Sequence, residues 1–255
     1  MSESIRAVER ALDVLLCFTS QTPELTMSQI SEMVGINKST VHRLLATLES
    51  KRFVEREPTS GVYRLGIRLV QMAFFTLERN DLRRMAAPYL HDLCDRYQEN
   101  VNLSVLDDVD VIYVDVVESK QRVKLAASTG ERLPAYCTAS GKAILAFVPE
   151  QDVRRLLDHG MHGYTRHTIT SQSALFKNLL ETKERGFAIS EQEFEEGINA
   201  IAAPIFSSTL EPIASISIAG PAYRLTRDRM DRIGSDLMAA AKKIAREVGL
   251  AESLG

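Results

Sequence analysis

A short run of basic and hydroxyl side chains between positions 38 and 43 has the chemistry needed to bind nucleic acid. It comprises Lys38, Ser39, Thr40, His42 and Arg43. Small hydroxyls can hydrogen-bond phosphate without bulk, and a helix that begins here adds a partial positive charge. The planar guanidinium of Arg43 matches the two acceptors of a guanine edge. The run therefore predicts contacts to DNA phosphates and bases.

Two helices would have to position this run. Thr26 can cap the first helix, and Gly35 accepts the positive φ needed where the chain reverses. The second helix is expected to begin near Asn37 or Lys38. Apolar residues recur at helical spacing in both segments: Met27, Ile30 and Val34, then Val41, Leu44, Leu45 and Leu48. Such stripes predict a packed helix-turn-helix in which the N-terminal end of the second helix contacts the DNA.

A hairpin is expected directly after the second helix. Residues 53–56 and 62–65 are strand-like and flank a turn that contains Pro58 and Gly61. Arg56 and Arg64 are its expected phosphate contacts. The alternative is a small helical subdomain with a solvated charged face. Agreement between the helix pair, the glycine corner and the hairpin favours a winged helix-turn-helix over residues 1–65.

The distribution of charge supports the same interpretation. The whole chain carries a net charge of −3. Residues 36–70 nevertheless hold seven basic and three acidic side chains, a local balance of +4. A basic segment on an acidic body is typical of a protein that touches DNA at one end only.

Length and composition set the remaining limits. A chain of 255 residues predicts two domains, each able to bury a core. Cys17, Cys94 and Cys137 are few and scattered, which favours a reducing cytosol over a disulfide framework or a structural zinc site. No signal peptide or bilayer-spanning apolar run is recognised, so a cytoplasmic location without membrane contact is expected.

Residues 66–80 form a segment of unusual apolar character. Ile67, Val70, Phe74 and Phe75 are among its apolar side chains, which point in nearly every direction around a helix. One small domain cannot cover such a helix, so we expect a linker helix that packs in a dimer. The alternative is a helix buried within its own chain.

The remainder, residues 81–255, predicts an α+β domain. A helix with Pro88 comes first, followed by alternating strands around 101–106, 111–117 and 123–127. Helices are expected over 139–147, after Pro149, and from a Ser171 cap to Gly186. Strands return at 187–190, 201–206 and 213–219, and Thr226 caps a long closing helix. Short turns between the strands predict an antiparallel sheet flanked by helices, able to enclose a small cavity.

Enzymatic chemistry is not evident. The Gly141-Lys142 pair lacks the upstream glycine of a phosphate-binding loop, and no nucleophile elbow occurs. We expect no metal site at His159, His162 and His167, which lie in a polar loop without nearby cysteine. The acidic run of Glu191, Glu193, Glu195 and Glu196 is expected to be solvated. We therefore expect no catalytic residues, no metal and no cofactor.

The chain resembles the IclR-type bacterial transcriptional regulators from Ser4 to about Gly249. The segments that carry the resemblance are 4–12, 38–45, 63–66, 137–143, 201–205 and 216–221. Asn37 departs from the proline that many relatives have before the recognition helix, but asparagine can cap a helix equally well.

The resemblance implies a winged helix-turn-helix followed by a GAF-like effector domain, assembled as homodimers or dimers of dimers. It also implies binding of a small metabolite, often a carboxylate. Ala139 and Ser140 would contact this effector by backbone N–H, with Ser190, Ala200 and Ser217 around it and Leu133 and Ile198 as apolar wall. The turn at Ala139-Ser140-Gly141 suits this role, because small residues at a helix start leave N–H groups free for an anion.

These observations predict a ligand-responsive, DNA-binding repressor of a metabolic or catabolic operon, located in the cytoplasm with the nucleoid. Its partners would be operator DNA and a small effector. One alternative is a small-molecule-converting enzyme with an accessory DNA-binding domain, against which the absence of a convergent catalytic set argues. Another is a constitutive architectural DNA binder, which would not need a cavity-forming body.

Overall fold

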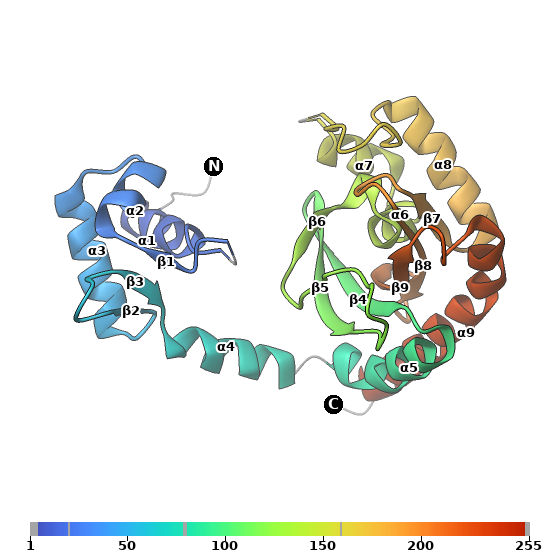
Figure 1. The fold of residues 1–255 in the computed structure, drawn as a ribbon, viewed down its shortest axis with the longest axis horizontal. Coiled ribbons are helices and arrows are strands. Elements are labelled where there is room, and N and C mark those ends of the chain that lie inside the picture. The colour runs from blue at the N-terminus through green and yellow to red at the C-terminus, as the bar shows by residue number, and fades with distance from the viewer. Residues whose placement is uncertain (1–4, 20, 79–80, 159, 253–255) are drawn as a thin grey trace. The chain divides into compact units, whose positions relative to one another are not determined.

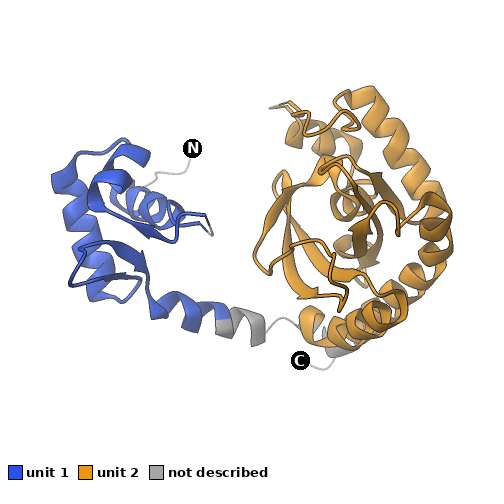
Figure 2. Cartoon of the chain, in the orientation of Figure 1, with its two compact units in different colours: residues 1–79 blue, residues 80–255 orange. Residues whose placement is uncertain are grey.

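The computed structural model describes residues 5–19, 21–78, 81–158 and 160–252, with the side chains of 74–78, 81 and 250–252 outside the description. The chain divides into two compact units, residues 1–79 and 80–255 (Figure 2). Each unit is built around its own hydrophobic core.

The first unit is a winged helix-turn-helix. Helices α1 (Arg6–Leu16), α2 (Met27–Met33) and α3 (Lys38–Ser50) precede the strands β2 (Val54–Arg56) and β3 (Tyr63–Leu65). Strand β1 (Glu24–Leu25) extends this hairpin to a three-stranded sheet of order β1-β3-β2. Thr26 forms a capping box with Gln29 at the start of α2, and Gly35 has a φ of 64° at the corner. Both local expectations are confirmed.

Helix α1 contacts the core through its C-terminal half. Val14 is fully buried against residues such as Ile30, Val41 and Leu45 of the helix-turn-helix. An apolar stripe of this segment is largely exposed: Ile5, Val8, Leu12 and Leu16, with Leu15 half-buried. Burial of Val14 places Cys17 and Phe18 in the core as well, so the helix presents its C-terminal end to the core and leaves its apolar stripe to solvent.

The expected linker is a helix, α4 (Ile67–Glu78). Ile67 and Val70 are 50% and 61% exposed, so the described residues of the first unit leave them uncovered. The side chains of Phe74 and Phe75, on which the dimer expectation also rested, lie outside the described residues.

The second unit contains a six-stranded antiparallel sheet in the order β6-β5-β4-β9-β8-β7 (Figure 1). The strands are β4 (Asn100–Asp107), β5 (Asp110–Val117), β6 (Arg132–Pro134), β7 (Ala188–Glu191), β8 (Ile198–Phe206) and β9 (Pro212–Pro221). The strand expected at 123–127 is wrong. That segment has no regular structure, and the short β6 forms the edge beside β5 instead.

Six helical segments accompany the sheet. They are α5 (Asp81–Tyr97), the 3₁₀ turn η1 (Ala135–Cys137), α6 (Ala139–Leu145), α7 (Glu150–Leu156), α8 (Gln172–Arg185) and α9 (Arg227–Glu252). Pro88 lies inside α5. Ser171 occupies the N-cap of α8, but its hydroxyl bonds that of Ser173 at 2.9 Å and does not cap a backbone amide. Gly186 ends that helix with a φ of 85°.

The two faces of the sheet differ in chemistry. Leu103, Ile216 and Ile218 belong to the large core with residues of α5 and α9. Period-two alternation directs their neighbours Asn102 and Ser217 to the opposite face, which α6 covers. Close packing there comes from small side chains: Ala139, Ala143, Ala188 and Ala202. Small and polar residues on one face of a sheet leave room for a cavity at the start of α6.

Candidate functional site

The start of α3 presents a polar surface to solvent. Asn37 caps the helix, because its Oδ1 accepts hydrogen bonds from the Thr40 amide and the Ser39 hydroxyl, both at 2.9 Å. Lys38, Ser39, His42 and Arg43 are exposed and Thr40 is half-buried. The residue types expected to contact DNA therefore share one end and the outer faces of one helix.

The two arginines of the hairpin differ in their interaction partners. Arg64 Nη2 lies 2.9 Å from Glu57 Oε2 and 3.5 Å from Glu24 Oε1. The Arg56 guanidinium lies 5.8 Å from the centroid of the Tyr63 ring and has no carboxylate partner among the described residues. Arg56 can meet a phosphate as it stands, whereas Arg64 must exchange weak, exposed ion pairs for one.

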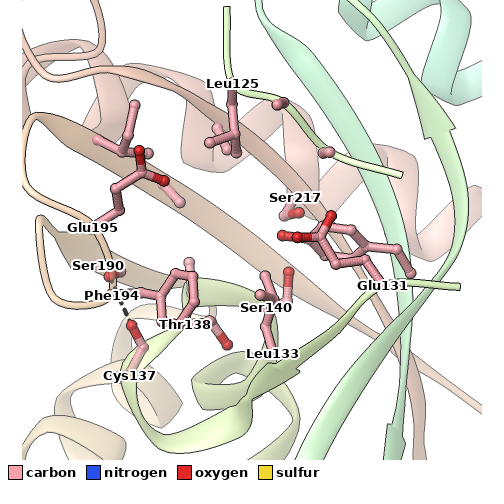
Figure 3. Close-up of a pocket in the computed structure, with 17 residues that line it drawn as sticks. Leu125, Glu131, Leu133, Cys137, Thr138, Ser140, Ser190, Phe194, Glu195 and Ser217 are labelled. Carbon is pink, nitrogen blue, oxygen red and sulfur yellow. Dashed lines mark hydrogen bonds between the residues drawn. The ribbon is translucent and has the colours of Figure 1, made fainter. Parts of the chain in front are cut away.

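A pocket opens in the second unit between the start of α6 and strands β8 and β9 (Figure 3). It encloses about 70 Å³. All seven residues expected around an effector line this pocket: Leu133, Ala139, Ser140, Ser190, Ile198, Ala200 and Ser217. They come from five elements and from segments up to about 85 residues apart, so the tertiary fold brings them together.

The pocket floor holds hydrogen-bonding groups at the helix start. Thr138 Oγ1 accepts from the Gly141 amide at 3.2 Å, and Lys142 N donates to Thr138 O at 3.0 Å. The first amides of a helix have no partner within it, so the N–H groups of Ala139 and Ser140 remain for another acceptor. Ser190 Oγ already donates to Cys137 O at 3.1 Å, as the dashed line in Figure 3 marks.

Several lining residues were not anticipated. They are Tyr113, Leu125, Ala126, Ala127, Glu131, Cys137, Thr138, Phe194, Glu195 and Ala219. Two of them, Glu131 and Glu195, carry carboxylates, and none of the described lining residues is lysine, arginine or histidine. Glu195 belongs to the acidic run that we expected to be solvated, and it is exposed at the edge of the pocket. The one large apolar side chain within this run is Phe194, which is half-buried.

Another member of the acidic run is buried, which corrects the expectation that the run is solvated. Glu193 Oε1 accepts a hydrogen bond from Lys142 Nζ, which also donates to Ile189 O at 2.7 Å. The Lys142 side chain is 0% exposed and that of Glu193 is 8% exposed. Burial lowers the pKa of Lys142 and raises that of Glu193, while their mutual attraction opposes both shifts.

This ion pair fixes one wall of the pocket to the other. Lys142 lies two residues after Ser140 on α6, and Glu193 precedes Phe194 and Glu195 in the loop between β7 and β8. Two threonines hold the same loop: Thr165 Oγ1 donates to Gln192 O at 2.7 Å and Thr168 Oγ1 donates to Glu193 O at 2.6 Å. The loop position therefore depends on a charged contact with the pocket helix.

Other side chains in this unit that could take part in a reaction are not activated for catalysis. Burial raises the pKa of the Cys137 thiol to about 12, so it stays protonated at neutral pH and is a poor nucleophile. Burial also raises the pKa of Tyr113.

The described histidines of the polar loop show no metal-binding arrangement. His167 Nε2 accepts from Arg166 Nε at 3.1 Å, and His162 packs edge-on to Tyr164, whereas His159 lies outside the described residues. Within the described ranges, no three histidine, cysteine or acidic residues gather as metal ligands do.

A winged DNA-binding unit joined to a sheet domain with an internal pocket defines a class of protein, the one-component transcriptional regulator. The chain belongs to the IclR family of bacterial transcriptional regulators. Residues 7–58 match the IclR helix-turn-helix domain, and residues 74–246 match the bacterial transcriptional regulator IclR C-terminal domain. The members that it resembles are regulators and not enzymes, so the enzymatic alternative is not supported.

Individual relatives agree over nearly the whole chain. The transcriptional repressor IclR of Escherichia coli is 31% identical over 248 residues, covering 96% of this chain and 90% of the relative. A crystal structure of an IclR transcriptional regulator from Alicyclobacillus acidocaldarius has a TM-score of 0.86 and 30% identity, covering 96% and 100% of the two chains. An IclR homologue from Microbacterium hydrocarbonoxydans, complexed with 4-hydroxybenzoate, has a TM-score of 0.83 and 25% identity, covering 95% and 98%.

Proposed function

We propose that this chain represses a metabolic or catabolic operon under the control of a small carboxylate that binds the pocket at the start of α6. The observation that carries the proposal is the pocket itself, with two helix amides and four hydroxyl side chains (Thr138, Ser140, Ser190 and Ser217) around it. A carboxylate can accept from such amides. The 4-hydroxybenzoate complex of the Microbacterium homologue gives a precedent for a small aromatic acid in this family.

The DNA contacts proposed for this regulator come from α3 and the wing. Arg43 would read a guanine edge, and His42 lies beside it on the exposed surface. Lys38, Ser39 and Thr40 would hold phosphates at the start of the helix, while Arg56 and Arg64 would do so from the hairpin. The sequences that such contacts select define the operator.

The domain boundaries and the assembly are part of the same proposal. Residues 1–65 would read DNA, residues 66–80 would link and dimerise, and residues 81–255 would bind the effector. Exposed Ile67 and Val70 on α4 support a helix that packs against a second copy, giving a homodimer or a dimer of dimers. Such a dimer can bind the two half-sites of an operator at the same time.

The protein would work in the cytoplasm, associated with the nucleoid. None of the described helices is both long and apolar enough to cross a bilayer.

Operator selection followed by effector release tests this function. Genomic fragments retained by the purified full-length chain identify the operator, and gel shifts with small acids measure release. Ser140→Trp should fill the pocket, leaving operator affinity without effector intact and abolishing the response. Ser173→Trp, at an exposed serine on α8, is the matched control and should respond as wild type. A normal response from Ser140→Trp would place the effector elsewhere.

A further inference from the structure

A second hollow of the C-terminal unit lies between the C-terminal half of α9, the end of α8 and the turn that joins β8 to β9. This α9 groove has a volume of about 910 Å³ and shares no lining residue with the pocket at the start of α6. Its floor is apolar: Phe147 and Phe206 pack edge to face with ring centroids 4.9 Å apart, and Met238 lies close to Gly186. Along α9 the lining extends from Met238 to Gly249, about 16 Å or three helical turns.

The turn at the edge of the groove presents a leucine to solvent. Leu210 is 80% exposed and has a φ of 63°, a left-handed conformation that is unfavourable for a residue with a Cβ. Ser207 holds this turn, because its carbonyl accepts from the Leu210 amide at 3.1 Å and its Oγ accepts from the Glu211 amide at 3.2 Å. The turn therefore fixes an apolar side chain beside an apolar groove, which extends the surface available to a partner.

The rim of the α9 groove is basic. Lys183 from α8 and Lys242 and Arg246 from α9 line it, and all three are exposed. Within the described ranges none of them forms an ion pair, and none of the described lining residues is acidic. Residues 80–255 as a whole carry 21 basic and 25 acidic side chains. The positive rim is therefore a local feature of an acidic unit.

The floor and the rim together discriminate between occupants. Duplex DNA would meet the cations but would leave the apolar floor uncovered, because phosphates supply most of its contacts. A second copy of the chain, related by a two-fold axis, would place the same basic rim against itself. An added strand would find no amide at Pro204 in the part of β8 that lines the groove. A helix with one apolar face and acidic flanks complements both the floor and the rim.

We propose that the α9 groove docks an acidic amphipathic helix of a partner protein. The floor and Leu210 contact the apolar face of that helix, and the three rim cations pair with its carboxylates. The proposal does not depend on the pocket at the start of α6, because the two hollows share no lining residue. It adds a protein partner to a chain whose family binds DNA.

Labelled model peptides test this chemistry by fluorescence anisotropy on the full-length protein. The probe is a helical peptide of about four turns with leucines on one face and glutamates elsewhere. One control peptide has lysine in place of every glutamate, and a second has the same composition with its leucines spread around the helix. The acidic amphipathic peptide should bind at least about tenfold more tightly than either control, and less tightly at high salt.

Substitutions in the groove test where the peptide binds. Lys242→Glu combined with Arg246→Glu should weaken binding of the acidic peptide about tenfold or more and strengthen that of the lysine peptide. Arg232→Glu combined with Lys243→Glu is the matched control, since both residues are exposed on α9 and lie outside the lining. Leu210→Asp tests the apolar contact and should weaken binding of the acidic peptide about fivefold or more.

Several results would overturn the proposal. Equal binding of the three peptides, or the same loss of binding in the control double variant, would remove the acidic helix as the occupant. A smaller oligomer of Leu210→Asp by light scattering would assign the groove to a second copy of the chain. Weaker binding of random-sequence DNA by the Lys242→Glu, Arg246→Glu protein, with unchanged binding of the acidic peptide, would assign the rim to nucleic acid.

Discussion

Arg43 extends from the exposed side of α3, six residues after the Asn37 cap, without an ion-pair partner among the described residues. Its replacement by alanine should weaken cognate operator binding by about 1–3 kcal/mol and relax base preference at one position, because a bidentate guanine contact is lost. Competition gel shifts against operator variants measure both effects. Arg155→Ala, an exposed arginine in the second unit, is the control. Unchanged operator affinity in Arg43→Ala would contradict the placement of the recognition helix.

Glu57 holds Arg64 in the wing at 2.9 Å. Glu57→Gln should therefore strengthen binding to DNA of any sequence, roughly threefold to tenfold at low salt, because a negative charge disappears and a cation is released for phosphate. The gain should fade at high salt, where such exposed charges are screened. Fluorescence anisotropy with random-sequence duplexes at several salt concentrations provides the measurement. The matched control is Glu150→Gln, which breaks the Arg154 pair on α7, far along the chain from the wing. Weaker binding by Glu57→Gln would show that Glu57 orients Arg64 productively.

At the scale of elements, the buried Lys142–Glu193 pair ties the loop before β8 to α6. Lys142→Met should lower the free energy of unfolding by about 3–5 kcal/mol, since an unpaired carboxylate would remain buried. Effector affinity should fall too, because Phe194 and Glu195 lose their anchor. Thermal and chemical denaturation, together with calorimetry, separate the two effects.

The double variant Lys142→Met with Glu193→Leu distinguishes positioning from mere stability. Replacing both charges by apolar groups of similar size often costs little stability. Stability should largely return, while effector affinity should stay reduced because the directed contact that places the loop is gone. Operator affinity without effector should resemble wild type in both variants. Full recovery of effector binding in the double variant would show that the ion pair contributes to stability and does not position the loop.

At the scale of the whole molecule, we propose that assembly depends on α4, whose described apolar residues include two that are exposed. Ile67 and Val70 lie three residues apart on α4, hence on one face, and both are at least half exposed. Replacing both by lysine should yield a smaller oligomer and lower operator affinity, because two half-sites are no longer gripped together. Light scattering after size exclusion, with operator gel shifts, tests this prediction. Gln71→Lys on the same helix controls for added charge. The same assembly and affinity in both proteins would refute a dimer role for this face.

Local rules sufficed for much of the fold. Thr26 and Gln29 meet within one helical turn, and Gly35 and Gly186 are needed where the backbone enters the left-handed region. Signals of this kind involve residues a few positions apart, so the sequence by itself determined the helix-turn-helix, the hairpin and most strands of the second unit. Composition and charge likewise placed the basic segment at one end.

Tertiary structure decided which faces are buried and what the pocket contains. The stripe on α1 is apolar, yet Val14 is the residue that reaches the core, because the neighbouring helices determine which side is covered. Residues 123–127 alternate like a strand but find no pairing partner, since β6 takes that edge. Glu193 was wrongly predicted to be solvated, because its ion-pair partner Lys142 is 51 residues away in the chain. Burial and pairing are properties of distant neighbours, and a pattern confined to one segment of sequence does not contain them.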